Sequence, residues 1–200
     1  MPYQTDKQYR SLDLLLPTAD KLIDSDNYIE GYAATFDKPY PLYEYAGQKY
    51  YEVITQEALL DADLTDVIMQ YDHTGKVLAR QSNGTLLLKN DGYGLKIAAD
   101  LSKSQAAREL YQEITSGLIT KMSWGFTVNK QTYDKETRTN TISSIKKVYD
   151  VSAVSFPANT ATEISARCYL NAVIEAEKQQ AQEHKLALTK AKYYYLGGIN

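Results

Sequence analysis

From Asn27 onward, the sequence alternates short runs of β-favouring residues with turn signals, and this alternation limits the chain to a β-rich fold. Two of the turns are marked by Ser82-Asn83-Gly84 and Asn90-Asp91-Gly92. The chain also holds 18 tyrosines but only three phenylalanines and one tryptophan, which favours strands with half-exposed aromatic faces. Strands are predicted over residues 28–36, 50–54, 67–71, 85–89, 95–101, 121–130 and 149–156. Many short strands at such spacing indicate a β-barrel or a β-sandwich.

Two helices are predicted to interrupt the strands. Between Ser104 and Ser116, apolar residues recur at the i, i+3, i+4 and i+7 spacing of an amphipathic helix, and Gly117 follows as a C-terminal stop. A shorter helix is predicted from Gln56 to Ala62, behind Thr55 as its N-cap. The fold class predicted from these elements is α+β and rich in strands.

The composition changes at both ends of the strand-rich region. Residues 1–26 show no sustained period, and we interpret them as an N-terminal arm. Residues 168–196 contain neither Gly nor Pro and are rich in helix formers, which predicts a long, polar C-terminal helix. The sequence therefore predicts an arm over residues 1–26, a β-rich domain over 27–167 and a helical tail over 168–200.

Charge and ligand content disfavour several classes of protein. The net charge of −3 and the pI near 5.5 give no electrostatic footprint for nucleic acid. The single cysteine, Cys168, cannot form an intrachain disulfide, and one cysteine with two histidines is too few for a zinc site. Because the sequence also lacks a Gly-rich phosphate loop and an acidic metal cluster, we expect no cofactor and no metal. No run approaches the roughly 18 apolar residues of a membrane span, and the N-terminus lacks a signal-peptide core, so we expect a cytosolic protein without a membrane partner.

The first candidate catalytic residue is His73. His73 follows an apolar strand and precedes a turn containing Gly75, so its imidazole is expected at a strand end that a substrate can reach. An imidazole titrates near neutral pH and is well suited to move a proton. The alternative is a surface histidine beside a turn. The second histidine, His184, lies among polar residues of the predicted tail and is expected to be solvated.

Ser123 is the candidate nucleophile. It lies between Met122 and Trp124, and Gly125 follows two positions later. A strand of this kind presents a hydroxyl beside a backbone that another group can approach closely, and we expect the glycine to leave room for a substrate. The alternative is an ordinary strand serine. No Gly-x-Ser-x-Gly motif is present, so an α/β-hydrolase is not expected.

Asp150 precedes a run of apolar and small residues, where an unpaired carboxylate would be costly to bury. An imidazole would be a suitable partner for it. Asp72 is a poorer partner for His73, because strand alternation places these two neighbours on opposite faces. The alternatives for Asp150 are a turn cap or a pair with a nearby lysine.

Several segments in sequence order resemble the phage prohead maturation protease family, the capsid-assembly serine proteases related in fold to the herpesvirus assemblins. The matching segments are residues 31–37, 51–54, 72–73, 77–80, 84–88, 119–126 and 150–159. The family commonly has Asn-His-Asp around its histidine, where this chain has Asp72 and Thr74 as flanks. The usual Leu-Gly-Arg is Leu78-Ala79-Arg80 here.

The resemblance implies a serine endopeptidase with an assemblin-like, mostly antiparallel β-barrel, flanking helices and a helical tail. It places the nucleophile on Ser123, the general base on His73 and the third member on Asp150. It further implies action inside the assembling procapsid in the host cytoplasm, on scaffolding protein, on the N-terminal segment of the major capsid protein and on the protease itself. Self-association is a further expectation.

One alternative function belongs to another class. A β-rich capsid-assembly or scaffolding protein would keep this fold and act by binding, with the C-terminal helix as its interaction element. Such a protein would have no reason to keep both His73 and Ser123, and their joint presence favours the protease.

Overall fold

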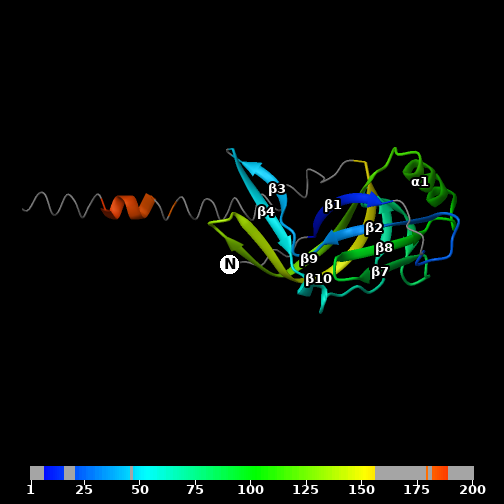
Figure 1. Cartoon of the computed structure of the whole chain (residues 1–200), viewed down its shortest axis with the longest axis horizontal. Coiled ribbons are helices and arrows are strands. Elements are labelled where there is room, and N and C mark those ends of the chain that lie inside the picture. Colours follow the sequence, from blue (N-terminus) through cyan, green and yellow to red (C-terminus); the bar gives the residue numbers. More distant parts are fainter. Residues whose placement is uncertain (1–6, 16–20, 46, 156–178, 180–181, 189–200) are drawn as a thin grey trace, which may run out of the picture. The chain divides into compact units, whose positions relative to one another are not determined.

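The computed structural model describes residues 7–15, 21–45, 47–155, 179 and 182–188 (Figure 1). The chain divides into two compact units, Met1–Glu163 and Ile164–Asn200. In the second unit, the described residues are helical and exposed, His184 among them. Cys168, the rest of the predicted tail and the expected boundary at residues 167–168 lie outside the described residues.

Ten strands, one α-helix and one 3-10 helix are described in the first unit. They are β1 Gln8–Leu15, β2 Tyr28–Thr35, β3 Tyr40–Tyr45, β4 Gln48–Ile54, η1 Gln56–Leu59, β5 Ile68–Tyr71, β6 Thr74–Arg80, β7 Leu86–Asn90, β8 Gly94–Asp100, α1 Gln105–Thr115, β9 Lys121–Asp134 and β10 Thr139–Val154. The expected α+β class, rich in strands, is confirmed.

The strands form one sheet in the order β3-β4-β10-β9-β1-β2-β8-β7. Beside this path, β5 pairs with β10, and β6 pairs with β5. Most pairs are antiparallel, but β10 pairs in parallel with β4 and with β5. The end strands β3 and β7 do not pair with each other, so among the described residues the sheet stays open. The closed barrel implied by the family resemblance is therefore not found, because no ladder joins the two ends of the path.

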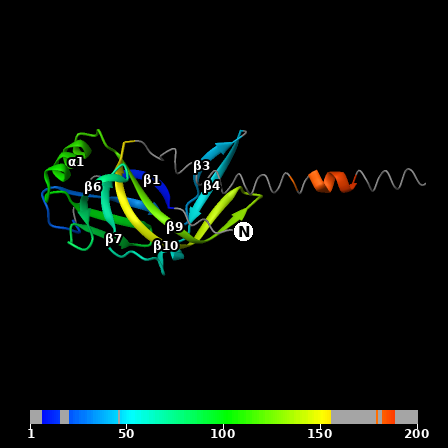
Figure 2. The same ribbon diagram turned by 180° about the vertical axis from the view of Figure 1, so that it is seen from behind.

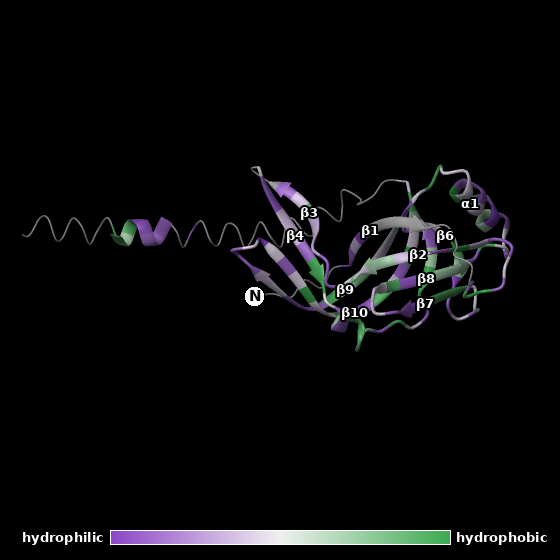
Figure 3. Ribbon diagram, viewed as in Figure 1, coloured by the Kyte–Doolittle hydropathy of each residue, from purple (hydrophilic) through white to green (hydrophobic). Residues whose placement is uncertain are grey.

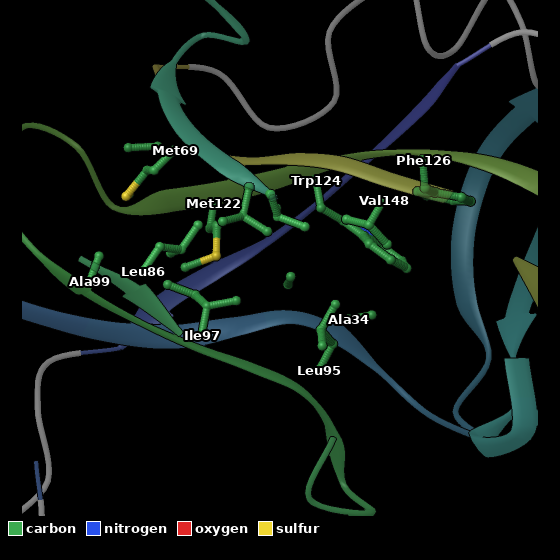
Figure 4. Packing of buried hydrophobic residues seen from close by; sticks show 14 of the residues in the cluster. Ala34, Met69, Leu86, Leu95, Ile97, Ala99, Met122, Trp124, Phe126 and Val148 are labelled. Carbon is green, nitrogen blue, oxygen red and sulfur yellow. The ribbon is translucent and has the colours of Figure 1, made fainter. Parts of the chain in front are cut away.

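Strand β1 connects two layers of this sheet. Its first part pairs with β9, from Gln8 opposite Phe126 to Asp13 opposite Lys121, and its end pairs with β2. The two layers face each other across a buried core. Figure 4 shows Met122 and Trp124 from the β9 layer opposite Leu95 and Ile97 from β8.

Apolar residues form the buried core, and hydrophilic residues cover much of β3 and of the end of β4 next to the β3–β4 turn (Figure 3). Helix α1 buries Ala107, Leu110 and Ile114, as its predicted apolar spacing requires, and lies next to β6 (Figure 2). Ser104 caps it by accepting a hydrogen bond from the Ala107 backbone at 3.1 Å. The shorter predicted helix is a single 3-10 turn over Gln56–Leu59.

The strands that the sequence analysis does not predict are β1, β3 and β6, together with the first half of β10. Strand β1 lies in the segment interpreted as an N-terminal arm, and its alternation is hidden because it buries the polar residues Gln8 and Arg10. Strand β6 is exposed from Thr74 to Val77 and buries only Leu78 and Ala79, which are neighbours, so it shows no apolar alternation. Within the part of the chain described, no helix is long and apolar enough to span a membrane.

Candidate active site

His73 lies in the tight turn between β5 and β6. Asp72 and His73 have positive φ angles of 47° and 58°, and the flanking residues Tyr71 and Thr74 pair with each other. Two successive residues in the left-handed region define a two-residue hairpin turn whose twist matches that of the strands. The sequence predicts His73 at a strand end that a substrate can reach. The turn places it at the strand end, but its side chain is only 6% exposed, because Tyr9 packs on the ring and Asp150 binds it.

Asp72 fixes this turn to the end of β10. Its backbone N–H donates to the Ala153 carbonyl at 2.9 Å. Its carboxylate accepts hydrogen bonds from the backbone N–H and the hydroxyl of Ser155, at 2.9 Å and 2.5 Å. Asp72 therefore positions the backbone of His73, and its carboxylate bonds to Ser155 and not to the ring. The sequence predicts Asp72 to be the poorer partner because of strand alternation, but the two residues lie in a turn and not on a strand.

The imidazole of His73 hydrogen-bonds through Nδ1 to Oδ1 of Asp150. The hydroxyl of Ser152 donates to the same carboxylate oxygen at 2.9 Å, and the ammonium of Lys7 contacts the other oxygen, Oδ2. Asp150 is only 1% exposed, and the His73 side chain only 6%. Both suggested partners of Asp150, an imidazole and a lysine, thus bind it at once.

These contacts set the charge state of Asp150. Burial alone raises the pKa of its carboxyl, but the hydrogen bonds from His73 and Lys7 outweigh that effect, so the net pKa is lowered. The carboxylate is therefore anionic at neutral pH and is held by three donors.

Gly125 makes room for this cluster. A Cβ atom at this position would lie 2.4 Å from Lys7 Cε, 2.7 Å from Asp150 Oδ2 and 2.9 Å from Tyr9 Cε1. The glycine therefore gives space to the protein's own side chains, where the sequence analysis expects space for a substrate. Tyr9 also packs on His73, with the two ring centroids 4.1 Å apart.

Ser123 lies on β9 two residues before Gly125 and is buried, with 2% of its surface exposed. Its neighbours Met122 and Trp124 point into the core, so alternation directs Ser123 to the opposite face of the strand. Ser123 pairs with Ser152 on β10, whose hydroxyl contacts Asp150 on that face. The two serines therefore lie side by side on neighbouring strands.

The structure brings His73 and Asp150 into direct contact but does not bond Ser123 to His73. The second ring nitrogen, Nε2 of His73, is buried and has no hydrogen-bond partner in the described part of the chain. The backbone of the turn lies level with Ala153, while the ring reaches Asp150. On β10, Ser152, the residue paired with Ser123, lies between these two positions in the sequence.

Three residues of the site, Lys7, Tyr9 and Ser152, are not predicted from the sequence. A signal for Ser152 is present, because Asp150 and Ser152 are two apart on a strand and must share a face. Lys7 and Tyr9 carry no local signal, because they reach the site only through the pairing of β1 with β9. In the residues described here, no cluster of histidine, cysteine and carboxylate side chains has the make-up of a metal site.

The family to which this chain belongs is identified by its similarity to known proteins. The sequence pattern of the caudovirus prohead serine proteases matches residues 16–179. The chain belongs to this family. The match confirms the resemblance drawn from the separate segments and spans β2 to β10 with all three candidate residues.

A solved structure of the bacteriophage T4 capsid assembly protease is similar to this prohead protease family member at 12% sequence identity, with a TM-score of 0.47. The likeness covers 76% of this chain and 99% of that one. No curated protein matches the chain.

Proposed function

We propose that this member of the prohead serine protease family is a maturation endopeptidase that works through a Ser123–His73–Asp150 triad. The observation that carries the proposal is the hydrogen bond between His73 Nδ1 and Asp150, beside the strand face that carries Ser123. Family membership supports a serine nucleophile, and the geometry supports these three residues as the group that uses it.

The proposed chemistry is acyl transfer. His73 takes the proton from the Ser123 hydroxyl through Nε2 as the oxygen attacks a peptide carbonyl. It then gives that proton to the leaving amine, and water releases the acyl group in a second step. Asp150 holds the proton on Nδ1, so that Nε2 is the basic nitrogen, and it stabilises the imidazolium that forms.

The unpartnered Nε2 atom supports this assignment. A buried polar atom without a partner is costly, and such atoms in native proteins are often reserved for function. Hydrogen bonds of catalytic groups commonly tighten only when substrate is bound. Movement of Ser123 and His73 toward each other on substrate binding would complete the triad.

The substrates we propose are capsid-related proteins: scaffolding protein, the N-terminal segment of the major capsid protein and the protease itself. The place of action is the assembling procapsid in the host cytoplasm. Family membership supports these proposals, because the family is that of caudovirus prohead proteases. We propose residues 168–200 as a docking or self-removed tail.

The experiment co-expresses this chain with the scaffolding and capsid proteins of its phage and follows their masses over time. The wild-type chain should shorten them at defined positions, and Ser123→Ala should abolish cleavage, a loss of about 10⁴-fold or more, with little change in melting temperature. Thr127→Val is the matched control, because it removes a buried hydroxyl from the same strand, four residues away, and should leave cleavage unchanged. Cleavage by Ser123→Ala within tenfold of wild type would exclude Ser123, and no cleavage by the wild type would favour a protein that acts only by binding.

A further inference from the structure

Lys7 is the positive charge in direct contact with the proposed triad. Its ammonium pairs with Asp150 Oδ2 on the side away from His73, which contacts Oδ1. Its Cε atom lies against Gly125, at a point that a Cβ would fill. The ammonium also lies 5.0 Å from the ring centroid of Tyr9 and 5.1 Å from that of Tyr149.

The contact is too enclosed to be an incidental surface pair. Asp150 is 1% exposed and the Lys7 side chain 32%, so the carboxylate end of the pair is shielded from solvent. Charge interactions weaken less with salt and solvent when one partner is buried. Two aromatic rings further enclose the ammonium.

The other charged groups near the site have partners of their own. On β10, Lys147 pairs with Asp63 at 2.6 Å. In the β5–β6 turn, the Asp72 carboxylate is bound by Ser155. Tyr9 and Tyr149 contribute aromatic rings beside the ammonium.

Resting on the proposed function, we propose that Lys7 is a positioning residue of the triad that shares the charge of Asp150 and so lowers the proton affinity of His73. With its negative charge shared by Lys7, the carboxylate stabilises a protonated imidazole less than an unshared carboxylate would. The histidine then stays neutral, and able to accept the serine proton, to a lower pH. Lys7 does not touch the reacting atoms and acts through Asp150.

Two measurements test this proposal. The first follows the ring protons of His73 by NMR against pH in a Ser123→Ala background, where self-cleavage cannot interfere. The chain has only two histidines, and the exposed His184 provides an internal reference. The second is the pH dependence of kcat/KM for a peptide substrate, with Ser123 present.

In Lys7→Met, the pH at which the His73 ring is half-protonated should rise by about half a unit to one unit, because a nearby positive charge is lost. On the acid side of the profile, kcat/KM should fall by about three- to tenfold relative to wild type, and the two should converge at high pH. Lys7→Arg should behave as wild type. The control Lys103→Met removes an ion pair to another buried aspartate, Asp100, and should shift neither curve.

An unchanged His73 midpoint in Lys7→Met would overturn the proposal, as would an equal rise in Lys103→Met. A rise that Lys7→Arg does not reverse would also overturn it, because the effect would then not come from charge. If the wild type cleaves no peptide, the proposed function fails, while the NMR titration still decides whether Lys7 sets the proton affinity of His73.

Discussion

His73 and Asp150 are 77 positions apart in the sequence and share a hydrogen bond because β5 runs parallel to β10. Ile68 of β5 pairs with Asp150 itself, and the strand ends in the turn that carries His73. The turn then directs the ring back along β10 to the carboxylate. The parallel pairing of β5 with β10, and not proximity in sequence, thus brings together the histidine and the aspartate of the proposed triad.

We expect Asp150→Asn to lower kcat by about 10³-fold, less than the loss in Ser123→Ala, because an amide no longer fixes the tautomer while the ring keeps part of its position. The melting temperature should also fall, because Lys7 loses its buried anionic partner. Peptide kinetics and thermal unfolding of both variants measure the two effects. A wild-type rate in Asp150→Asn would remove Asp150 from the triad.

Gly125→Ala should reduce activity strongly. The new Cβ would clash with Lys7 Cε and would meet Asp150 Oδ2 at 2.7 Å, so it would displace both the lysine and the carboxylate on which His73 depends. Since misplacement of a catalytic group by about 1 Å costs on the order of 10²-fold, we expect a loss of kcat/KM of that size. The control is Gly84→Ala, which has open space around it but a φ of +75°.

Gly84→Ala should therefore cost about 1 kcal/mol of unfolding free energy from backbone strain and leave kcat/KM unchanged. Denaturant unfolding and peptide kinetics on both variants separate the two kinds of damage. Equal activities would show that the space at Gly125 does not matter to the site.

The sequence predicts those strands and helices in which apolar residues recur at the spacing of a strand or of a helix. Helix α1 and strands such as β8 each bury an apolar face, so the spacing of their apolar residues can be recognised in the sequence. Strand β1 is not predicted, because its buried residue Arg10 is a cation neutralised by Glu52, which is 42 positions away. No pattern in the residues around Arg10 predicts an ion-pair partner so far away in the sequence.

The same distinction applies to the candidate site. The sequence predicts three candidate residues, His73, Ser123 and Asp150, from their chemistry and their flanking residues. The structure joins two of them, His73 and Asp150, by a hydrogen bond. The roles of Lys7 and Tyr9 depend on the pairing of β1 with β9, which residue patterns do not reveal. The space at Gly125 is visible in the sequence, but what fills it is not.

Acid should destabilise the protein through Asp100, which is buried in the β8 layer. Burial raises the pKa of this carboxyl, but hydrogen bonds from Ser25 and Ser102 and the pair with Lys103 lower it further than burial raises it. A group whose folded-state pKa is lowered contributes stability above its unfolded value, near 4, and loses it as pH falls through the folded value.

The unfolding free energy of the Ser123→Ala protein should therefore fall below about pH 4, with about 1–2 kcal/mol of the loss due to Asp100. Asp100→Asn should be less stable at pH 7 and should show a flatter decline. Urea unfolding at a series of pH values measures both. If the unfolding free energies of the Ser123→Ala protein and of Asp100→Asn fell in parallel with pH, Asp100 would not be the source of the acid sensitivity.

The ion pair between Arg10 and Glu52 anchors β1 beside the site. Glu52 is fully buried and also accepts hydrogen bonds from Tyr40 and Asn140. Burial lowers the pKa of Arg10, but Glu52 more than offsets this, so the net pKa is raised and the guanidinium remains charged. Arg10 follows Tyr9, which packs on His73, so the pair links the stability of β1 to the position of the ring.

Arg10→Met or Glu52→Leu alone should lower the unfolding free energy by about 3–5 kcal/mol, because each leaves a buried charge without its partner. The double variant should lose less than the sum of the two, since no lone charge remains. Urea unfolding of the four proteins measures this coupling, and losses that add to within about 0.5 kcal/mol would contradict it. Because either single change loosens β1, kcat/KM should fall together with stability, while the double variant should recover part of both.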